Sequence, residues 1–165
     1  MSLALAPEPP PLVSERPQDA SAVDALILRA FGPGRYAKAA ERLREGRQPL
    51  PHLSPVAWDR GRIVGSVRQW AVRVGGAPAI FLGPIVVDPS YRGQGLGAAL
   101  VDEACAAAAR AGHALIVLVG DMPFFGPLGF ASAPDVEMPG PVDRRRVLVR
   151  ALKPGADAKG LVTAV

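Results

Sequence analysis

The residues best spaced for chemistry lie between positions 92 and 97, which read Arg92-Gly93-Gln94-Gly95-Leu96-Gly97. A β-branched apolar run precedes them and an alanine-rich run follows, so the pattern predicts a strand, a glycine-rich turn and a helix. The first amides of a helix have no partner within it, and the helix dipole adds partial positive charge there. Side chains at the glycines would keep a ligand away from the backbone. This segment therefore predicts a site for an anion, most simply the phosphate or pyrophosphate of a cofactor.

Two predicted strands and one predicted helix surround this site. The strand over 79–87 leads into the glycines, the helix covers 96–111 and stops at Gly112, and the continuous apolar run at 114–119 is typical of a buried parallel strand. Gly83-Pro84 interrupts the first strand, so a bulge or a splayed edge is expected there.

The rest of the chain predicts a mixed α/β sheet in one domain over residues 12–165, after a flexible tail at 1–11. The first helix begins at Asp19 or Ser21, and its apolar stripe is Val23, Leu26, Ile27, Ala30 and Phe31. The remaining predicted elements are a strand at 12–15, a helix at 36–45, hairpin strands at 56–59 and 63–74, a hairpin turn at Gly75-Gly76, a compact turn at 122–130 and a final strand at 145–152.

The composition excludes several classes of protein. With 165 residues, 49% hydrophobic and 21% charged, the chain is predicted to be a soluble domain with a real core. The net charge of +4 comes without a basic run interleaved with aromatics, so neither nucleic acid nor a membrane is an expected partner. The cluster Arg144 to Arg146 is interpreted as a solvated hairpin face. Met1 to Pro11 does not resemble a signal peptide, which favours the cytoplasm.

No metal site or disulfide is predicted. Cys105 is the single cysteine and falls in the helix pattern as a small buried hydrophobe. His52 and His113 are isolated, which is too few ligands for a metal.

Two motifs resemble the GNAT N-acyltransferase superfamily. The segment from Arg92 to Gly97 has the form R-x-x-G-x-G after a strand and resembles the superfamily's acyl-CoA-binding motif. Residues 124–130 resemble its later F-Y-x-x-x-G-F element, and Gly120-Asp121 precedes that element as in small bacterial members. The resemblance covers roughly residues 12–165. It implies a mixed, mostly antiparallel sheet with a central parallel, splayed strand pair flanked by helices.

The resemblance also implies how a co-substrate binds. Acetyl-CoA or another acyl-CoA would place its diphosphate on the amides of residues 93–98, with its pantetheine arm along residues 85–87. An amine would attack the thioester directly, and a backbone N–H near Val86 or Val87 would stabilise the oxyanion, with Val87 the candidate catalytic residue. The implied cofactor-binding residues are Ile85, Val86, Val87, Arg92, Gly93, Gln94, Gly95, Leu96, Gly97, Ala98, Phe124 and Phe125.

The chain departs from the family at one position. In the family, a tyrosine protonates the leaving thiolate. Phe125 occupies the corresponding position here, and its ring donates no proton. A free thiol has a pKa of about 8.5, so a thiolate is able to leave and take its proton from water. Asp121 is the candidate general base or anchor for the substrate ammonium, although an Asp after a strand also commonly caps the next turn. Glu137 and His52 are further candidates without a spacing argument.

The predicted function is therefore acyl transfer from acyl-CoA to the primary amine of a small molecule or peptide. Because of Phe125, a non-catalytic module that binds acyl-CoA or the pantetheine of an acyl-carrier protein is an alternative. A dinucleotide-binding oxidoreductase is a second alternative, since Gly93-x-Gly95-x-x-Ala98 fits G-x-G-x-x-A and Asp121 ends a later strand. The hairpins before the motif and the short stretch after it disfavour that fold. An exposed terminal strand would also be able to pair across a homodimer.

Overall fold

The structure is a computed structural model that describes residues 9–31 and 39–165. Most of the predicted tail, residues 1–8, lies outside the described residues. So do residues 32–38, where the predicted end of the first helix and the start of the second fall.

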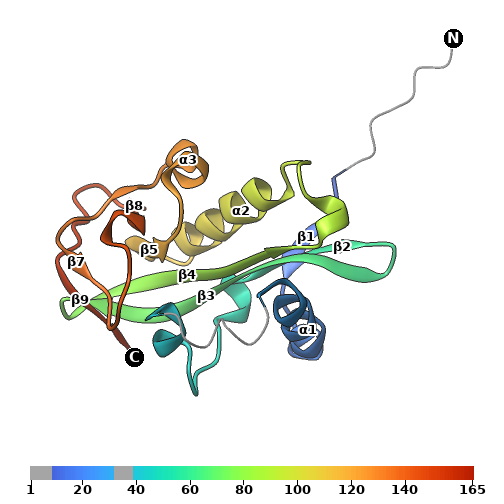
Figure 1. Ribbon diagram of the computed structural model, residues 1–165, viewed down its shortest axis with the longest axis horizontal. Helices are drawn as coiled ribbons and strands as arrows, with labels where there is room; N and C mark the ends of the chain where they lie inside the picture. The colour runs from blue at the N-terminus through green and yellow to red at the C-terminus, as the bar shows by residue number, and fades with distance from the viewer. Residues whose placement is uncertain (1–8, 32–38) are drawn as a thin grey trace, which may run out of the picture.

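One twisted sheet forms the centre of the molecule (Figure 1). Its neighbouring strands are, in order, β1 (Leu12–Ser14), β2 (Pro55–Asp59), β3 (Arg62–Val74), β4 (Ala77–Val87), β5 (Leu115–Val119), β8 (Val147–Ala151) and β6 (Ala131–Ser132). Every neighbouring pair along this path is antiparallel except β4 and β5, which are parallel. Strand β9 (Gly160–Ala164) pairs with the far half of β3 and with the short β7 (Val136–Glu137). The predicted sheet, with its central parallel pair, is confirmed.

Helix α2 (Leu96–Arg110) covers one face of the sheet (Figure 1). The predicted helix is confirmed, and its apolar positions Leu96, Leu100 and Ala104 are buried against the core. The helix packs closely because β3 carries a glycine beneath it: a Cβ at Gly65 would lie 2.8 Å from Cδ1 of Leu100. Gly112, with a φ of +87°, follows the end of the helix as expected.

Helix α1 (Ala20–Phe31) covers the opposite face (Figure 1). Val23, Leu26 and Ile27 are buried against the sheet as predicted. The predicted stripe is wrong at its end, because Ala30 and Phe31 are exposed. These two residues line cavities instead of the core.

The central strands separate at the predicted irregularity. Strands β4 and β5 pair only at Ile80 with Ile116 and at Phe81 with Val117. Val67 of β3 pairs with Ile85, and Gln69 pairs with Leu82, so Gly83 and Pro84 form a bulge opposite a single residue. The indole Nε1 of Trp70, buried on β3, donates a 2.6 Å hydrogen bond to the carbonyl of Gly83. This bond ties the bulge to β3 and keeps it away from β5.

Two predicted elements differ in the structure, and one strand was not expected. The second helix appears in the described residues only as a 3-10 helix, Ala39–Leu43, which continues into a turn at residues 44–46. The predicted final strand begins two residues late, because Asp143 caps a 3-10 turn at Arg144–Arg146 by accepting from the amide of Arg145. Strand β9 was not predicted.

The short helix α3 (Met122–Phe125), followed by a 3-10 turn, confirms the compact turn expected at 122–130. In the described part of the chain, no helix has the length and apolar character needed to cross a membrane.

Candidate active site

The glycine-rich loop and the start of α2 form the predicted anion site. Gly93 and Gly95 both have a φ of +79°, a conformation that favours glycine. The first bond into the helix runs from the amide of Ala99 to the carbonyl of Gly95, so the preceding amides of the first turn are available to a ligand. A Cβ on either glycine would meet no heavy atom within 4 Å, so both glycines face open space.

This loop lines a cavity of about 400 Å³, called here the cofactor cavity. Its lining residues are Ala30, Phe31, Ile85, Val86, Val87, Tyr91, Arg92, Gly93, Gly95, Leu96, Gly97, Ala98 and Phe124. Of the predicted cofactor residues, Gln94 and Phe125 do not line it. The side-chain Nε2 of Gln94 instead donates to the carbonyl of Ser90, and Phe125 lines the neighbouring cavity.

The edge of β4 that faces β5 offers hydrogen-bonding groups to this cavity. The amide of Asp88 donates to the carbonyl of Val64 on β3, with an N to O distance of 2.8 Å. Amides alternate in direction along an antiparallel strand, so those of Val87 and Ile85 point away from β3. Strand β5 does not pair with this part of β4. An extended ligand that lies where a neighbouring strand would pair is therefore able to accept hydrogen bonds from these two amides.

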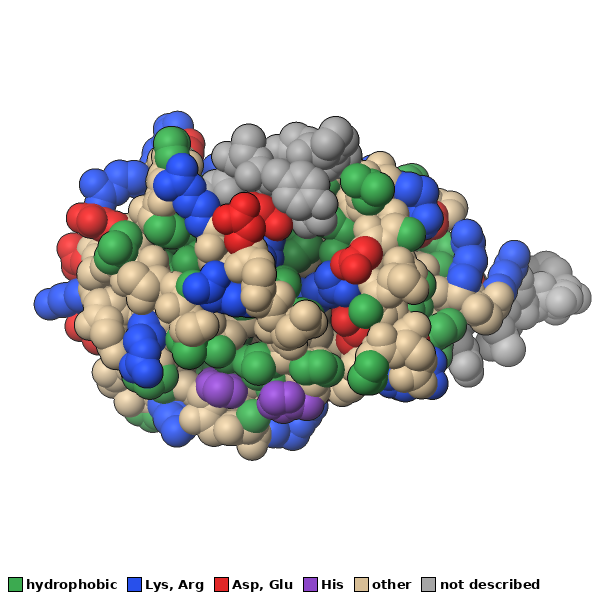
Figure 2. Space-filling view, turned by 90° about the horizontal axis from the view of Figure 1, so that it is seen from below, with side chains coloured by type: hydrophobic (Ala, Val, Ile, Leu, Met, Phe, Trp, Pro, Cys, Tyr) green, Lys and Arg blue, Asp and Glu red, His purple; other side chains and the backbone are tan. Residues whose placement is uncertain are grey.

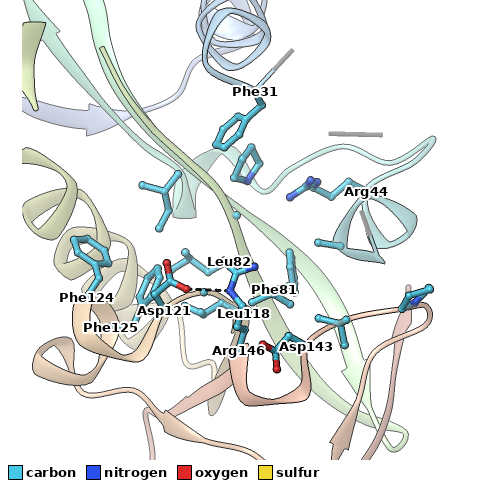
Figure 3. A pocket seen from close by; sticks show the side chains of 18 residues that line it. Phe31, Arg44, Phe81, Leu82, Leu118, Asp121, Phe124, Phe125, Asp143 and Arg146 are labelled. Atoms are coloured by element: carbon cyan, nitrogen blue, oxygen red, sulfur yellow. Dashed lines mark hydrogen bonds and ion pairs between the residues drawn. The ribbon is translucent and has the colours of Figure 1, made fainter. Parts of the chain in front are cut away.

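A second cavity of about 600 Å³, the splay cavity, lies where β4 and β5 separate (Figure 3). Its apolar wall includes Phe81, Leu82, Leu118 and Phe125. Arg44, Asp121, Asp143 and Arg146 supply the charged part of the lining. Phe31, Ile85 and Phe124 line both this cavity and the cofactor cavity, so the two cavities meet at these residues.

Asp121 lies in the wall of the splay cavity, as its place after β5 predicts. Its Oδ1 accepts a 3.0 Å hydrogen bond from Nε of Arg146, and Figure 3 shows this pair at the cavity edge. Its backbone carbonyl accepts from the amides of Phe124 and Phe125, which starts α3, but its side chain makes no capping bond. The carboxylate therefore faces the cavity rather than the turn.

Phe125 fills the wall with a packed ring. It is 7% exposed and makes edge-to-face contacts with Phe124 and Phe130, with ring centroids 4.8 Å and 5.6 Å away. Gly120 is required beside it, because a Cβ there would lie 2.3 Å from Cε2 of Phe125. Among the described residues that line the splay cavity, none is Tyr, Ser, Cys or His, so the carboxylates of Asp121 and Asp143 are the candidate proton acceptors in this part of the lining.

The other sequence candidates lie elsewhere. Glu137 on β7 and His52 in the turn Pro51–Leu53 line neither cavity. Cys105 is buried on the inner face of α2, and this burial raises the pKa of its thiol. Within residues 9–31 and 39–165, no group of three or more His, Cys, Asp or Glu side chains is placed to hold a metal.

Sequence reasoning missed two arginines of the splay cavity. The predicted solvated face is confirmed, because Arg144, Arg145 and Arg146 are all exposed, but Arg146 also pairs with Asp121 at the edge of the cavity. Arg44 reaches the cavity from the turn after Ala39–Leu43, and no local pattern marks either residue. The one available signal was the position of Arg146 directly before a strand, at the same edge of the sheet as Asp121.

Comparison with known proteins shows consistent similarity to one family. The family described as "Acetyltransferase (GNAT) family" matches residues 21–130. YhbS, an N-acetyltransferase of Escherichia coli, is 37% identical over 122 residues, which cover 72% of each chain. Its crystal structure in complex with CoA matches with a TM-score of 0.80 and 30% identity, covering 97% of this chain and 92% of that one.

Two further relatives are similar. A GNAT family acetyltransferase from Brucella melitensis, crystallised with acetyl-CoA, matches with a TM-score of 0.71 and 26% identity over 93% of this chain and 94% of that one. Glucosamine 6-phosphate N-acetyltransferase of Trypanosoma brucei is 40% identical over 78 residues, covering 44% of this chain and 53% of the relative. Together with the family match over most of the chain, these similarities show that the protein belongs to the GNAT acetyltransferase family.

Proposed function

We propose that this protein transfers an acetyl or short acyl group from acyl-CoA to a primary amine of a small molecule or peptide. The observation that carries the proposal is the continuous path formed by the start of α2, the open edge of β4 and the splay cavity. Crystal structures of the two relatives with CoA and acetyl-CoA support the same co-substrate here.

The path matches the parts of acyl-CoA in order. The diphosphate would bind the amides of residues 93–98 with Arg92 beside them, because helix N-termini favour anions. The pantetheine arm would run along β4 and accept from the outward amide of Val87. Ile85 lines both cavities, whereas Val87, the candidate from the sequence, lines only the cofactor cavity. We therefore infer that the Ile85 amide, rather than that of Val87, faces the thioester oxygen.

The reaction would be a direct displacement. The neutral amine attacks the thioester carbon, the backbone amide stabilises the oxyanion, and the C–S bond breaks to release the thiolate of CoA. Asp121 would take the proton that the attacking nitrogen loses. The leaving thiolate would be protonated by water, since Phe125 has no proton to give.

The proposal is tested by incubating the purified protein with acetyl-CoA and a set of primary amines. Thiol release and the mass of the acetylated amine are measured together, with acetyl-CoA hydrolysis in the absence of amine as the baseline. Amine-dependent release of CoA supports the proposal. Binding of acetyl-CoA without transfer to any amine would instead indicate a binding module.

A further inference from the structure

A third cavity of about 240 Å³ lies on the face of the sheet that carries α1. Acidic and basic side chains gather together near the middle of that face (Figure 2). Those that line this cavity, called here the polar cavity, are Glu15, Asp24, Glu41, Arg44, Arg47 and Arg68. Arg44 and Pro84 line both the polar cavity and the splay cavity, so the two are neighbours.

Arg44 occupies the boundary between these cavities. Its side chain is only 8% exposed, and its Nε and Nη2 both donate to Oε2 of Glu41, at 3.2 Å and 2.8 Å. The opposite edge of the guanidinium faces the bulge of β4, because a Cβ on Gly83 would lie 3.5 Å from Nη1. Figure 3 shows Arg44 reaching toward the splay cavity from the side opposite Asp121. Of this ion pair, Arg44 lines the splay cavity and Glu41 does not, so the guanidinium is the member of the pair that borders this cavity.

The carboxylates around Arg44 are already engaged by arginines. Arg68 donates to Glu15 at 3.0 Å and to Asp24 at 2.6 Å, and Arg44 donates to Glu41. A cationic group on a ligand would have to compete with a guanidinium for each of them. An anionic group would instead add to the edge of Arg44, because a planar guanidinium is able to bind more than one oxygen anion at once. Partial burial strengthens such a contact, since water competes less for it.

We propose that the acceptor amine also carries an anionic group, a carboxylate or a phosphate, which binds Arg44 while the amine faces the thioester across the splay cavity. This inference rests on the proposed function, because it takes the molecule that binds in the splay cavity to be the amine that is acetylated. The anion would lie at the boundary of the splay and polar cavities, and the amine on the side of Asp121. Arg44 is thus a specificity-determining residue.

The direct test is calorimetric titration of the CoA-bound protein with matched pairs of amines, one with and one without the anion. Glucosamine 6-phosphate with glucosamine tests a phosphate, and leucine with leucinamide, together with a set of dipeptides and their amides, tests a carboxylate. At least one anionic member is expected to bind about tenfold or more tightly than its neutral partner, as a charge-assisted hydrogen bond implies. Equal binding, or no binding, of both members in every pair would overturn the proposal.

Variants then ask whether Arg44 is responsible. Arg44→Lys keeps the charge but removes the planar fork, so the preference for the anion is expected to fall about tenfold while CoA affinity is unchanged. Because Arg44→Gln alone would strand buried Glu41, the charge is removed with the double variant Glu41→Gln/Arg44→Gln. Arg42→Gln is the matched control, since Arg42 is exposed in the same turn, donates to the carbonyl of Pro139 and lines none of the three cavities.

The outcomes separate this inference from the proposed function. A preference for anions that survives in the double variant contradicts the role of Arg44. Arg44-dependent binding of anionic amines without any acetyl transfer would retain the site and reject the proposed reaction. Acetylation of neutral and anionic amines with equal kcat/KM would support the proposed acetyl transfer but contradict the proposed anion site at Arg44.

Discussion

At the scale of single residues, the splay cavity holds two carboxylates with different surroundings. Asp121 accepts from Arg146 at the mouth of the cavity, and Asp143 accepts from the side chain and the amide of Arg145. The hydrogen bonds from Arg145 hold the pKa of Asp143 below its ordinary value, so Asp143 stays ionised and is a poor proton acceptor. Asp121 accepts from Arg146 through Oδ1 and follows β5 where it separates from β4, so its position favours it as the general base.

We expect Asp121→Asn to lower kcat about a hundredfold, the contribution typical of a positioned base, with the affinity for acetyl-CoA unchanged. Asp143→Asn is the matched control, because Asn also caps helical turns well and this carboxylate is not expected to move a proton. Steady-state kinetics of both variants with one amine acceptor measure the difference. A larger loss of kcat in Asp143→Asn than in Asp121→Asn would reverse the assignment.

At the scale of elements, the opening between β4 and β5 depends on how two segments are held. The Trp70 indole anchors the bulge at Gly83, and the ring of Phe125 packs against Gly120 to place α3 beside β5. Both contacts are buried, so each is expected to affect stability and site geometry together.

Trp70→Phe is expected to destabilise the protein by about 1–3 kcal/mol, because it leaves the buried carbonyl of Gly83 without its donor. Acetyl transfer should also fall, since the bulge borders the splay cavity. Trp58→Phe on β2 is the control. Cζ of Arg16 lies 5.7 Å from the centroid of this indole, and β3 separates its strand from the bulge on β4. Denaturant unfolding measures the free energy of unfolding of the two variants. An equal or larger loss of stability in Trp58→Phe would contradict the role of the Trp70 indole in holding the bulge.

Gly120→Ala tests the packing of α3. The new Cβ would lie 2.3 Å from the Phe125 ring, so the ring has to move, at a cost of about 1–3 kcal/mol typical of overpacking. The double variant Gly120→Ala/Phe125→Leu replaces the ring and should recover part of that loss. The free energies of unfolding of the single and double variants form a cycle. Additive effects of the two substitutions would show that the ring is not the obstacle.

At the scale of the whole molecule, local patterns predicted the centre of the fold and long-range contacts determined the rest. Helix α2 and strand β5 were predicted because their apolar patterns are strong and continuous. Strand β9 is as long as β5 but was missed because it lacks a continuous apolar run and is held by distant partners: a Cβ on Gly75 would lie 2.0 Å from the carbonyl of Lys159. The glycine loop was likewise visible in the sequence, whereas Arg44 and Arg146 join the site through tertiary packing alone.

The global stability should depend on pH through His113, which follows α2. Burial, followed by the nearby His52 and Lys153, lowers its pKa below the ordinary value of 6.5, and Figure 2 shows the two histidine side chains next to each other. The unfolded chain takes up this proton near pH 6.5 and the folded protein only at lower pH, so the free energy of unfolding falls as pH decreases through that interval.

We expect His113→Asn to flatten this dependence between about pH 7.5 and about pH 5, relative to the native protein. His52→Asn should keep most of it, because burial of His113 is the larger cause. Urea unfolding at the two pH values measures both. If the free energy of unfolding of His113→Asn depended on pH as steeply as that of the native protein, His113 would not be the cause of the dependence.

The central claim, that the start of α2 binds the diphosphate of acyl-CoA, is tested most directly by calorimetric titration with acetyl-CoA. Gly95→Glu is compared with Gly76→Glu, since both glycines have a left-handed φ and open space, but Gly76 lies in the β3–β4 turn and lines none of the three described cavities. We predict micromolar binding by the native protein and by Gly76→Glu, and a loss of about tenfold or more in Gly95→Glu, whose carboxylate would enter the anion site. No binding by the native protein, or equal loss in the two variants, would contradict the claim.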